Sequence, residues 1–295
     1  MKKINITIPT KNQLWGLKAW DVIKECGPQV AGTDLVNFLN GGNAEDRYNT
    51  KDGKLACSAW TSTAGSYGYV RCVGANGGMY NECPDSRTPA VRPVISNPKS
   101  ILSNLTWEKQ GDIYVTRYGE YPQDKVVDPQ LSAELEETYH SGRLVATGKK
   151  YTFDSTPLKA YDVSFQPVQY PEYVYNGKKY IRFLNIPSDV DLKNVSRKKA
   201  RKIKRAAVRW VEVQPIEWYS DEIAKILLSK KALTSRLQII NKEEYDCDFK
   251  STPMYEFLNG SFLDEIQPSQ PKKVAHAVSF ALAKAKEDAI VKSKA

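Results

Sequence analysis

The sequence predicts an α+β fold in which short strands and long ordered loops outnumber a few short helices. Residues 43–97 are rich in Gly, Asn, Ser, Thr, Tyr and Cys, which suits strands and loops better than helices. Residues 150–185 are rich in tyrosine and contain Asn176-Gly177, the dipeptide typical of a two-residue hairpin turn. The helical patterns elsewhere are few, and one of them is a C-terminal tail.

The N-terminal elements follow from alternation and capping signals. Residues 4–8 alternate between apolar and polar side chains and predict a short strand. Thr10 is a good N-cap for a helix that should end at Gly27-Pro28. Thr33 caps a second helix, which should run to Asn40 and stop at Gly41-Gly42.

The later elements are a series of strands and helices. Residues 112–118 predict a strand that a turn at Tyr121-Pro122-Gln123 should close. Residues 207–213 and 223–228 predict two further strands. The expected helices are a short acidic one at 129–140, one at 255–262 with Phe257 and Leu258 inward, and a C-terminal tail at 273–294.

Composition narrows the class of protein. The chain has 295 residues, 41% hydrophobic and 26% charged, which is ordinary for a globular protein. It contains no apolar run of about 18 residues and no signal-peptide core, so we expect synthesis in the cytoplasm and no membrane insertion. The five cysteines include no CxxC pair, which favours buried thiols over disulfides or zinc. We therefore expect no cofactor and no metal.

The net charge of +9 is unevenly distributed, with seven cations in one basic segment and several lysines in the C-terminal tail. Such a segment can contact a nucleic-acid backbone or an acidic protein surface, and it is equally typical of a solvated helix face or an exposed hairpin connection. It lacks the interleaved aromatic residues of a single-strand binding groove. Its cations are Arg197, Lys198, Lys199, Arg201, Lys202, Lys204 and Arg205.

Two groups of short motifs carry a resemblance to a known family. The later group is Gly119-Glu-Tyr-Pro-Gln123, Pro215-Ile-Glu-Trp218, Leu227-Leu-Ser-Lys230 and Leu258-Asn259 followed by Phe262. The earlier group is Ile8-Pro9-Thr10, Trp60-Thr-Ser62, a glycine turn and Val91-Arg92-Pro93. These motifs resemble an uncharacterised bacterial and phage domain family related to formylglycine-generating enzymes and C-type lectins. The resemblance implies C-type-lectin-like elements.

The order of the two groups is reversed relative to that family, in which the Tyr-Pro-Gln part comes first. The expected organisation is a lectin-like half or minimal domain at 1–97, a connector at 98–111 carrying Trp107, a second lectin-like α+β part at 112–266, and a linker with a helical tail at 267–295. The two parts could close within one chain as a permuted domain, fold as separate units, or be exchanged between subunits.

Catalytic chemistry is poorly supported. The enzyme relatives use paired cysteines, but Cys72 and Cys83 are separated in sequence and a reactive thiolate needs an electropositive, exposed setting. Loop 74–88 could bind calcium through oxygen ligands or could be a hydrogen-bonded glycine loop. The carboxylate pair Asp264-Glu265 matches no metal-binding pattern.

We therefore expect a non-enzymatic recognition or assembly protein, most simply a phage virion structural or host-binding component that contacts copies of itself, other virion proteins or a host surface ligand. Aromatic and arginine residues dominate binding hot spots. The residues expected at the binding surface are Tyr67, Tyr69, Asn76, Met79, Tyr80 and Arg87. The alternative is a cytosolic regulator or inhibitor that uses segment 197–205 on an acidic surface or nucleic acid.

Overall fold

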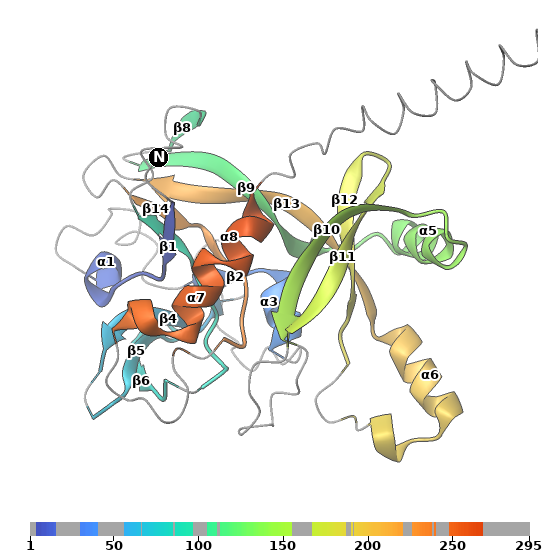
Figure 1. The fold of residues 1–295 in the computed structure, drawn as a ribbon, viewed down its shortest axis with the longest axis horizontal. Coiled ribbons are helices and arrows are strands. Elements are labelled where there is room, and N and C mark those ends of the chain that lie inside the picture. Colours follow the sequence, from blue (N-terminus) through green and yellow to red (C-terminus); the bar gives the residue numbers. More distant parts are fainter. Residues whose placement is uncertain are drawn as a thin grey trace, which may run out of the picture.

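The computed structural model has a mixed α+β architecture, rich in antiparallel strands (Figure 1). The structure describes residues 4–15, 30–40, 56–65, 67–84, 86–96, 105–110, 113–154, 167–186, 190, 192–220, 226–237, 239 and 248–267. Among these residues no helix is both long and apolar enough to cross a membrane. The α+β class expected from the sequence is confirmed.

The largest sheet is built around two long strands, β9 (Ile113–Lys125) and β13 (Val208–Ser220), which pair antiparallel. The opposite edge of β13 is shared, because its first residues pair with β12 (Lys178–Leu184) and its last residues pair with β14 (Ile226–Ser229). Figure 1 shows the result, with β1 and β14 at one end of the molecule and β10–β12 at the other. Strands β11 (Pro167–Tyr175) and β10 (Val145–Asp154) continue the sheet beyond β12.

Early and late parts of the chain meet in this sheet. Strand β7 (Val94–Ser96) pairs on one side with β1 (Asn5–Thr7) and on the other with β14. The Asn259 side chain reinforces the contact, because its amide accepts from the Ile6 N–H and donates to the Ile6 carbonyl, each at 2.8 Å. Arg92 Nε likewise donates to the Ser229 carbonyl at 2.8 Å. Within this chain the first and last described segments are thus joined by direct hydrogen bonds.

Two smaller sheets and several short helices complete the fold. The first small sheet is β15-β2-β3 and the second is β4-β5-β6. Their strands are β2 (Val30–Gly32), β3 (Ala56–Cys57), β4 (Ala59–Ala64), β5 (Val70–Val73), β6 (Met79–Glu82) and β15 (Lys231–Ala232), and β8 (Trp107–Gln110) adds to β9. The helices are α1 (Lys11–Trp15), α3 (Asp34–Leu39), α5 (Pro129–His140), α6 (Arg197–Ala206), α7 (Pro253–Asn259) and α8 (Ser261–Ile266), with 3-10 turns η1 (Leu192–Asn194) and η2 (Phe249–Ser251).

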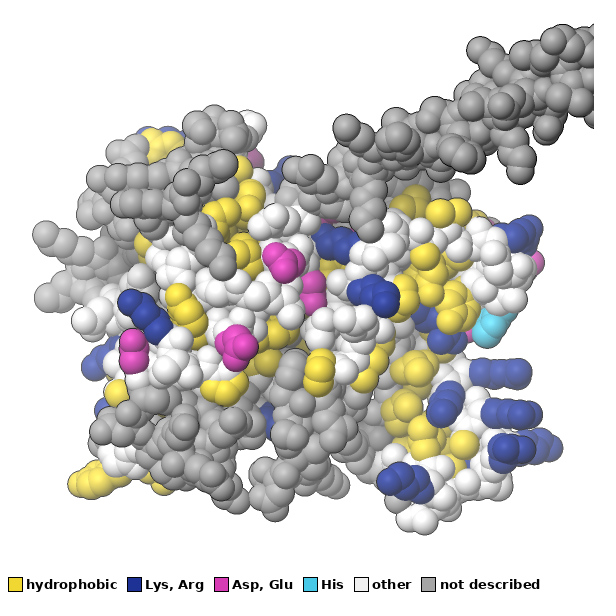
Figure 2. Space-filling view, viewed as in Figure 1, with side chains coloured by type: hydrophobic (Ala, Val, Ile, Leu, Met, Phe, Trp, Pro, Cys, Tyr) yellow, Lys and Arg dark blue, Asp and Glu magenta, His cyan; other side chains and the backbone are white. Residues whose placement is uncertain are grey.

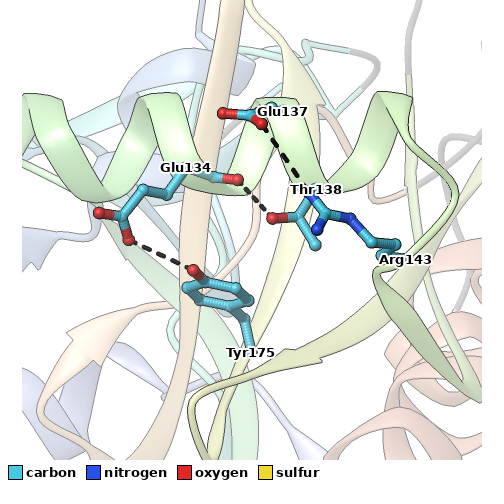
Figure 3. A pocket seen from close by; sticks show the side chains of 5 residues that line it. All are labelled: Glu134, Glu137, Thr138, Arg143 and Tyr175. Atoms are coloured by element: carbon cyan, nitrogen blue, oxygen red, sulfur yellow. Dashed lines mark hydrogen bonds and ion pairs between the residues drawn. The ribbon is translucent and has the colours of Figure 1, made fainter.

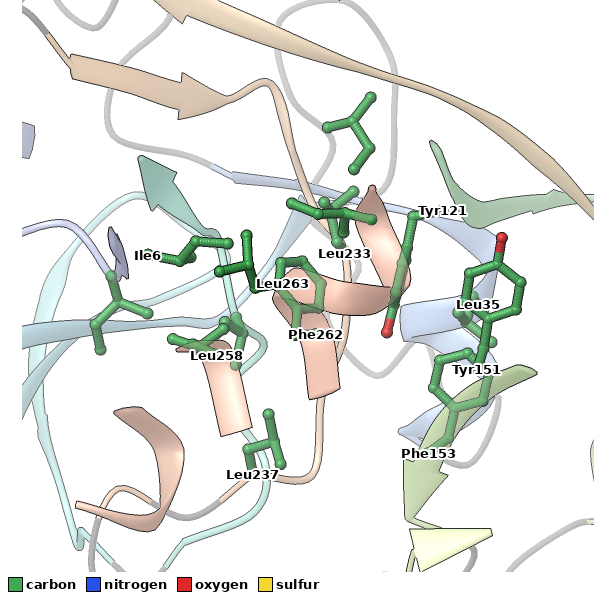
Figure 4. Close-up of a cluster of buried hydrophobic side chains, with 14 of the residues drawn as sticks. Ile6, Leu35, Tyr121, Tyr151, Phe153, Leu233, Leu237, Leu258, Phe262 and Leu263 are labelled. Atoms are coloured by element: carbon green, nitrogen blue, oxygen red, sulfur yellow. The ribbon is translucent and has the colours of Figure 1, made fainter. Parts of the chain in front are cut away.

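The main core lies between the large sheet and helices α7 and α8, and draws on both ends of the chain (Figure 4). Tyr121 is fully buried near its centre, and its ring packs edge-on against Tyr151 and at an angle against Phe262. Ile6 and Leu35 come from the early segment and are also fully buried. A fully buried aromatic side chain contributes several kcal/mol, about 3–5 on truncation to alanine, so this cluster is a major source of stability.

Several local predictions are confirmed. Thr33 caps α3, accepting a hydrogen bond from the Val36 N–H. Asn176 and Gly177 have φ angles of 48° and 77°, which fit the expected two-residue turn between β11 and β12. Helix α5 has the bounds expected for the acidic helix. The expected helix after Thr10 is described only over Lys11–Trp15, and the tail helix at 273–294 lies outside the described residues.

Three local predictions are wrong. Tyr121-Pro122-Gln123 continues β9 instead of turning, which a proline tolerates because β8 pairs with β9 only over residues 113–116 and leaves that edge open further along. Trp107, expected in a connector, begins β8. The single helix expected at 255–262 is two helices, α7 and α8, separated at Gly260, whose φ and ψ of −108° and −105° are not helical.

Candidate functional site

Of the predicted tyrosine residues, Tyr67 and Tyr69 lie in the turn between β4 and β5, and Tyr80 lies in β6. Trp60 in β4 is fully buried and its indole Nε1 donates to the Leu237 carbonyl at 3.1 Å. Tyr67 is 97% exposed, Tyr69 40% and Tyr80 47%. The β4-β5-β6 sheet and its turn therefore combine a buried tryptophan with three exposed tyrosine side chains.

The turn between β4 and β5 holds Tyr67 in an unusual conformation. Its φ is +56°, and that of Gly68 is +78°. Gly65 N–H donates to the Tyr69 carbonyl at 2.6 Å, which closes the turn. A non-glycine residue with positive φ costs of order 1 kcal/mol, and such strain concentrates at functional sites. Tyr67 is thus both the most exposed large hydrophobic side chain described and a strained one.

The turn between β5 and β6 uses the predicted residues mostly for its own structure. The Asn76 side-chain carbonyl accepts from the Gly78 N–H at 2.9 Å, while its amide donates to the Tyr80 hydroxyl. The Tyr80 ring covers Gly74 so closely that a Cβ there would lie 2.4 Å from a ring carbon. Met79 is half-buried. In the described part of loop 74–88, which omits Asp85, Asn76 therefore acts as a turn former, and no group of three His, Cys, Asp or Glu residues could hold a metal among the described residues.

Arg87 does not share the exposed surface expected for it. It is only 6% exposed, and burial lowers the pKa of its guanidinium. Arg236, at 8% exposure and with a φ of +65°, lies close enough to feel its charge, and burial together with Arg87 lowers the Arg236 pKa to about 10. Because Pro84 accepts a hydrogen bond from the Ile239 N–H, this region is packed against the later segment. Arg87 thus belongs to the interior.

The two candidate redox cysteines lie apart on the β5-β6 pair. Cys72 in β5 is opposite Tyr80, whereas Cys83 follows the end of β6 and is exposed. Burial, followed by the charge of Glu82, raises the pKa of the Cys72 thiol to about 11. At neutral pH Cys72 is therefore a protonated, poorly nucleophilic thiol.

The predicted basic segment forms helix α6, which projects from the β12-β13 connection (Figures 1 and 2). The Ser196 hydroxyl accepts from the Lys199 N–H, and Arg209 Nη1 donates to the Ala206 carbonyl at 2.7 Å, so both ends are capped. Ala200 and Ile203 are half-buried, whereas all seven predicted cations are exposed. None of the seven forms an ion pair with any residue that the structure describes.

A buried polar cluster at β10, β11 and α8 was not expected from the sequence as a unit. Glu172 is fully buried, and its carboxylate accepts from the hydroxyls of Tyr151 at 2.6 Å and Thr147 at 2.9 Å. Glu265 is 7% exposed and accepts from the Thr152 N–H at 2.9 Å through Oε1, while its buried Oε2 has no hydrogen-bond partner among the described residues.

The environment of Glu265 favours its neutral form. Burial raises the pKa of this carboxyl from 4.5 to about 8, and the hydrogen bonds from Thr152 and the charge of Lys149 only partly oppose that rise. Asp264, its neighbour in the predicted carboxylate pair, is exposed, and its charge also raises the Glu265 pKa. Two adjacent positions in a helix point in different directions, so the pair cannot converge on one ion.

One shallow hollow of about 290 Å³ lies between α5 and the β11-β12 hairpin (Figure 3). Its polar groups bond to one another. The Tyr175 hydroxyl donates to Glu134 at 3.3 Å, the Thr138 hydroxyl donates to the Glu134 carbonyl at 2.7 Å, and Arg143 faces Glu137 at 3.8 Å. These contacts account for the hollow as part of the α5 packing.

Comparisons with protein families, with curated proteins and with solved structures find no match to this chain.

Proposed function

We propose that this protein is a non-enzymatic recognition and assembly protein that associates with copies of itself through the tyrosine surface, defined as Tyr67 and Tyr69 in the β4-β5 turn together with Tyr80 in β6. The observation that carries the proposal is Tyr67, a 97% exposed aromatic side chain held at positive φ. An exposed aromatic residue on a buried frame loses little side-chain entropy on binding and gains a large contact area.

The motif resemblance extends this proposal to a setting. A lectin-like frame that displays loops suits a phage virion structural or host-binding component, and self-association is the simplest assembly for such a protein. The proposal assigns no reaction to the chain. Cys72 supports this, because it is a buried thiol with a raised pKa.

The test is the oligomeric state measured by size-exclusion chromatography with light scattering across a range of concentrations. Wild-type protein should form a defined oligomer, and Tyr67→Gly should shift it toward the monomer. Because glycine relieves the positive φ, the same variant should be as stable as wild type or slightly more stable. Val127→Ser, which removes another exposed apolar side chain (78% exposed) outside this sheet, is the matched control and should leave the oligomer intact. A wild-type protein that stays monomeric at all concentrations would contradict assembly through this surface.

A further inference from the structure

We propose that helix α6 binds the phosphate backbone of double-stranded nucleic acid, independently of base sequence and of the tyrosine surface. In Figure 1 α6 and the β4-β5-β6 sheet lie at opposite sides of the molecule, so the two surfaces can act separately.

Helix α6 lies in the connection between two strands of the large sheet. The chain leaves β12 and returns in β13, and the Asn185 N–H donates to the Ala207 carbonyl at 2.8 Å across the base of this connection. Both neighbouring strands belong to the largest sheet. Figure 2 shows lysine and arginine side chains standing out in rows from this part of the surface. The cations are therefore held on an anchored element and point into solvent.

The charge on α6 lacks compensation within the described protein. Three cations occupy the first turn, where the helix dipole disfavours positive charge, and the first turn contains no acidic residue. Arg197 and Arg201, Lys198 and Lys202, and Arg201 and Arg205 are like-charge pairs at i,i+4 spacing, each of which costs about 0.2–0.5 kcal/mol. A helix this short is marginal by itself. A polyanion would remove these penalties together, so binding should also make the helix more stable.

The dimensions and side chains favour a duplex over other acidic partners. Ten helical residues span roughly 15 Å, and a duplex carries about nine phosphate charges over that length. A helix with its side chains is also about as wide as the major groove, roughly 12 Å. Protein interfaces need an apolar, often aromatic centre, but the only apolar side chains of α6 are alanines and Ile203, which is half-buried. The absence of aromatic residues from α6 also argues against single strands, which are held by stacking.

The experiment measures the anisotropy of a labelled random-sequence duplex of about 20 base pairs, titrated with the full chain at several salt concentrations. The test variant is the triple substitution Lys198→Gln, Lys202→Gln and Arg205→Gln. The control triple removes the same net charge elsewhere, at the exposed residues Lys109, Lys150 and Lys250. Glutamine retains helix propensity, so α6 should still form.

Wild-type protein should bind with an affinity that falls steeply with salt. The α6 triple should bind the duplex about 100-fold more weakly than wild type, and its plot of log K against log salt should be less steep by about 2–3. The control triple should change the affinity and the slope far less. Hydrogen exchange of α6 amides should slow when the duplex is added to wild type. The α6 triple should elute as wild type does in size-exclusion chromatography, which separates this result from the tyrosine surface.

Three outcomes would overturn the proposal. No binding at low salt would exclude the duplex as a ligand. Equal losses in the two triples would show a diffuse effect of net charge instead of a site on α6. Polyglutamate could also be added at a concentration that supplies as many negative charges as the duplex. If it displaced the duplex, α6 would be assigned to an acidic protein partner.

Discussion

Replacement of Glu265 by glutamine should remove a pH dependence of stability from this protein. In the folded state burial holds the pKa of this carboxyl at about 8, against 4.5 for an unperturbed glutamate. Between these two values the folded chain keeps the proton while the unfolded chain ionises. The unfolded state then binds fewer protons, so stability falls as pH rises.

The size of this loss of stability follows from the difference between the folded and unfolded pKa values. Linkage gives a loss of about 1.4 kcal/mol per pH unit from this single group, and about 5 kcal/mol in total once the pH exceeds the folded pKa. Glutamine does not titrate, and its carbonyl can still accept from the Thr152 N–H. Wild type and Glu265→Gln should therefore be similarly stable near pH 4.5, whereas at about pH 7.5 the variant should be the more stable by about 4 kcal/mol.

Urea unfolding followed by tryptophan fluorescence at a series of pH values measures the difference directly. Hydrogen exchange at the Thr152 amide gives a local measurement of the same contact, since that N–H is bonded to Glu265. Glu256→Gln, an exposed substitution on α7, is the matched control and should run parallel to wild type. Parallel curves for wild type and Glu265→Gln would refute the assignment of a neutral buried carboxyl.

Three further substitutions test the scaffold, each measured by urea unfolding. Gly119→Ala should destabilise the protein by about 3 kcal/mol or more, because Gly119 has a φ of +72° and an added Cβ would lie 2.4 Å from a backbone oxygen. A loss of stability below about 1 kcal/mol would contradict this geometry. Trp218→Phe should lower the free energy of unfolding by about 1–2 kcal/mol more than Trp210→Phe does. The reason is that the Trp218 indole donates a hydrogen bond at 2.8 Å, whereas the buried Trp210 indole has no partner among the described residues. Equal losses in the two variants would contradict this difference. Asn259→Ala should cost about 2–4 kcal/mol by leaving both backbone groups of Ile6 unpaired, and a neutral result would show that these two bonds are replaced by water.

Features that depend on a few adjacent residues were predictable from the sequence. The Asn176-Gly177 turn needs two positive φ angles, which those residues adopt easily, and the Thr33 cap needs only a hydroxyl next to a helix start. The exposure of the α6 cations was predictable for the same reason, since seven charges in ten residues leave no apolar face wide enough to bury. Tyr67, Tyr69 and Tyr80 were expected at the surface and are exposed.

Features that depend on distant parts of the chain were not predictable. The burial of Glu265 results from α8 packing against β10, and its sequence next to Asp264 resembles an ordinary exposed acidic pair. Pro122 continues a strand because of where β8 stops pairing, which no local pattern records. Arg87 lies next to exposed loop residues in sequence but is buried against the later segment near Arg236.

The motif residues of this chain share a physical role that does not depend on their order along the sequence. Short strands and loops leave backbone groups unpaired, and buried groups of this kind must be satisfied. Asn259 satisfies Ile6, Arg92 satisfies the Ser229 carbonyl, and the Gln123 amide donates to two carbonyls of β13, at 3.1 and 3.0 Å. Each bond needs the two segments to meet in space, and none needs them to follow one another in sequence. The early Val-Arg-Pro segment and the later strands of this chain can therefore make these contacts because β7 reaches β14 in space.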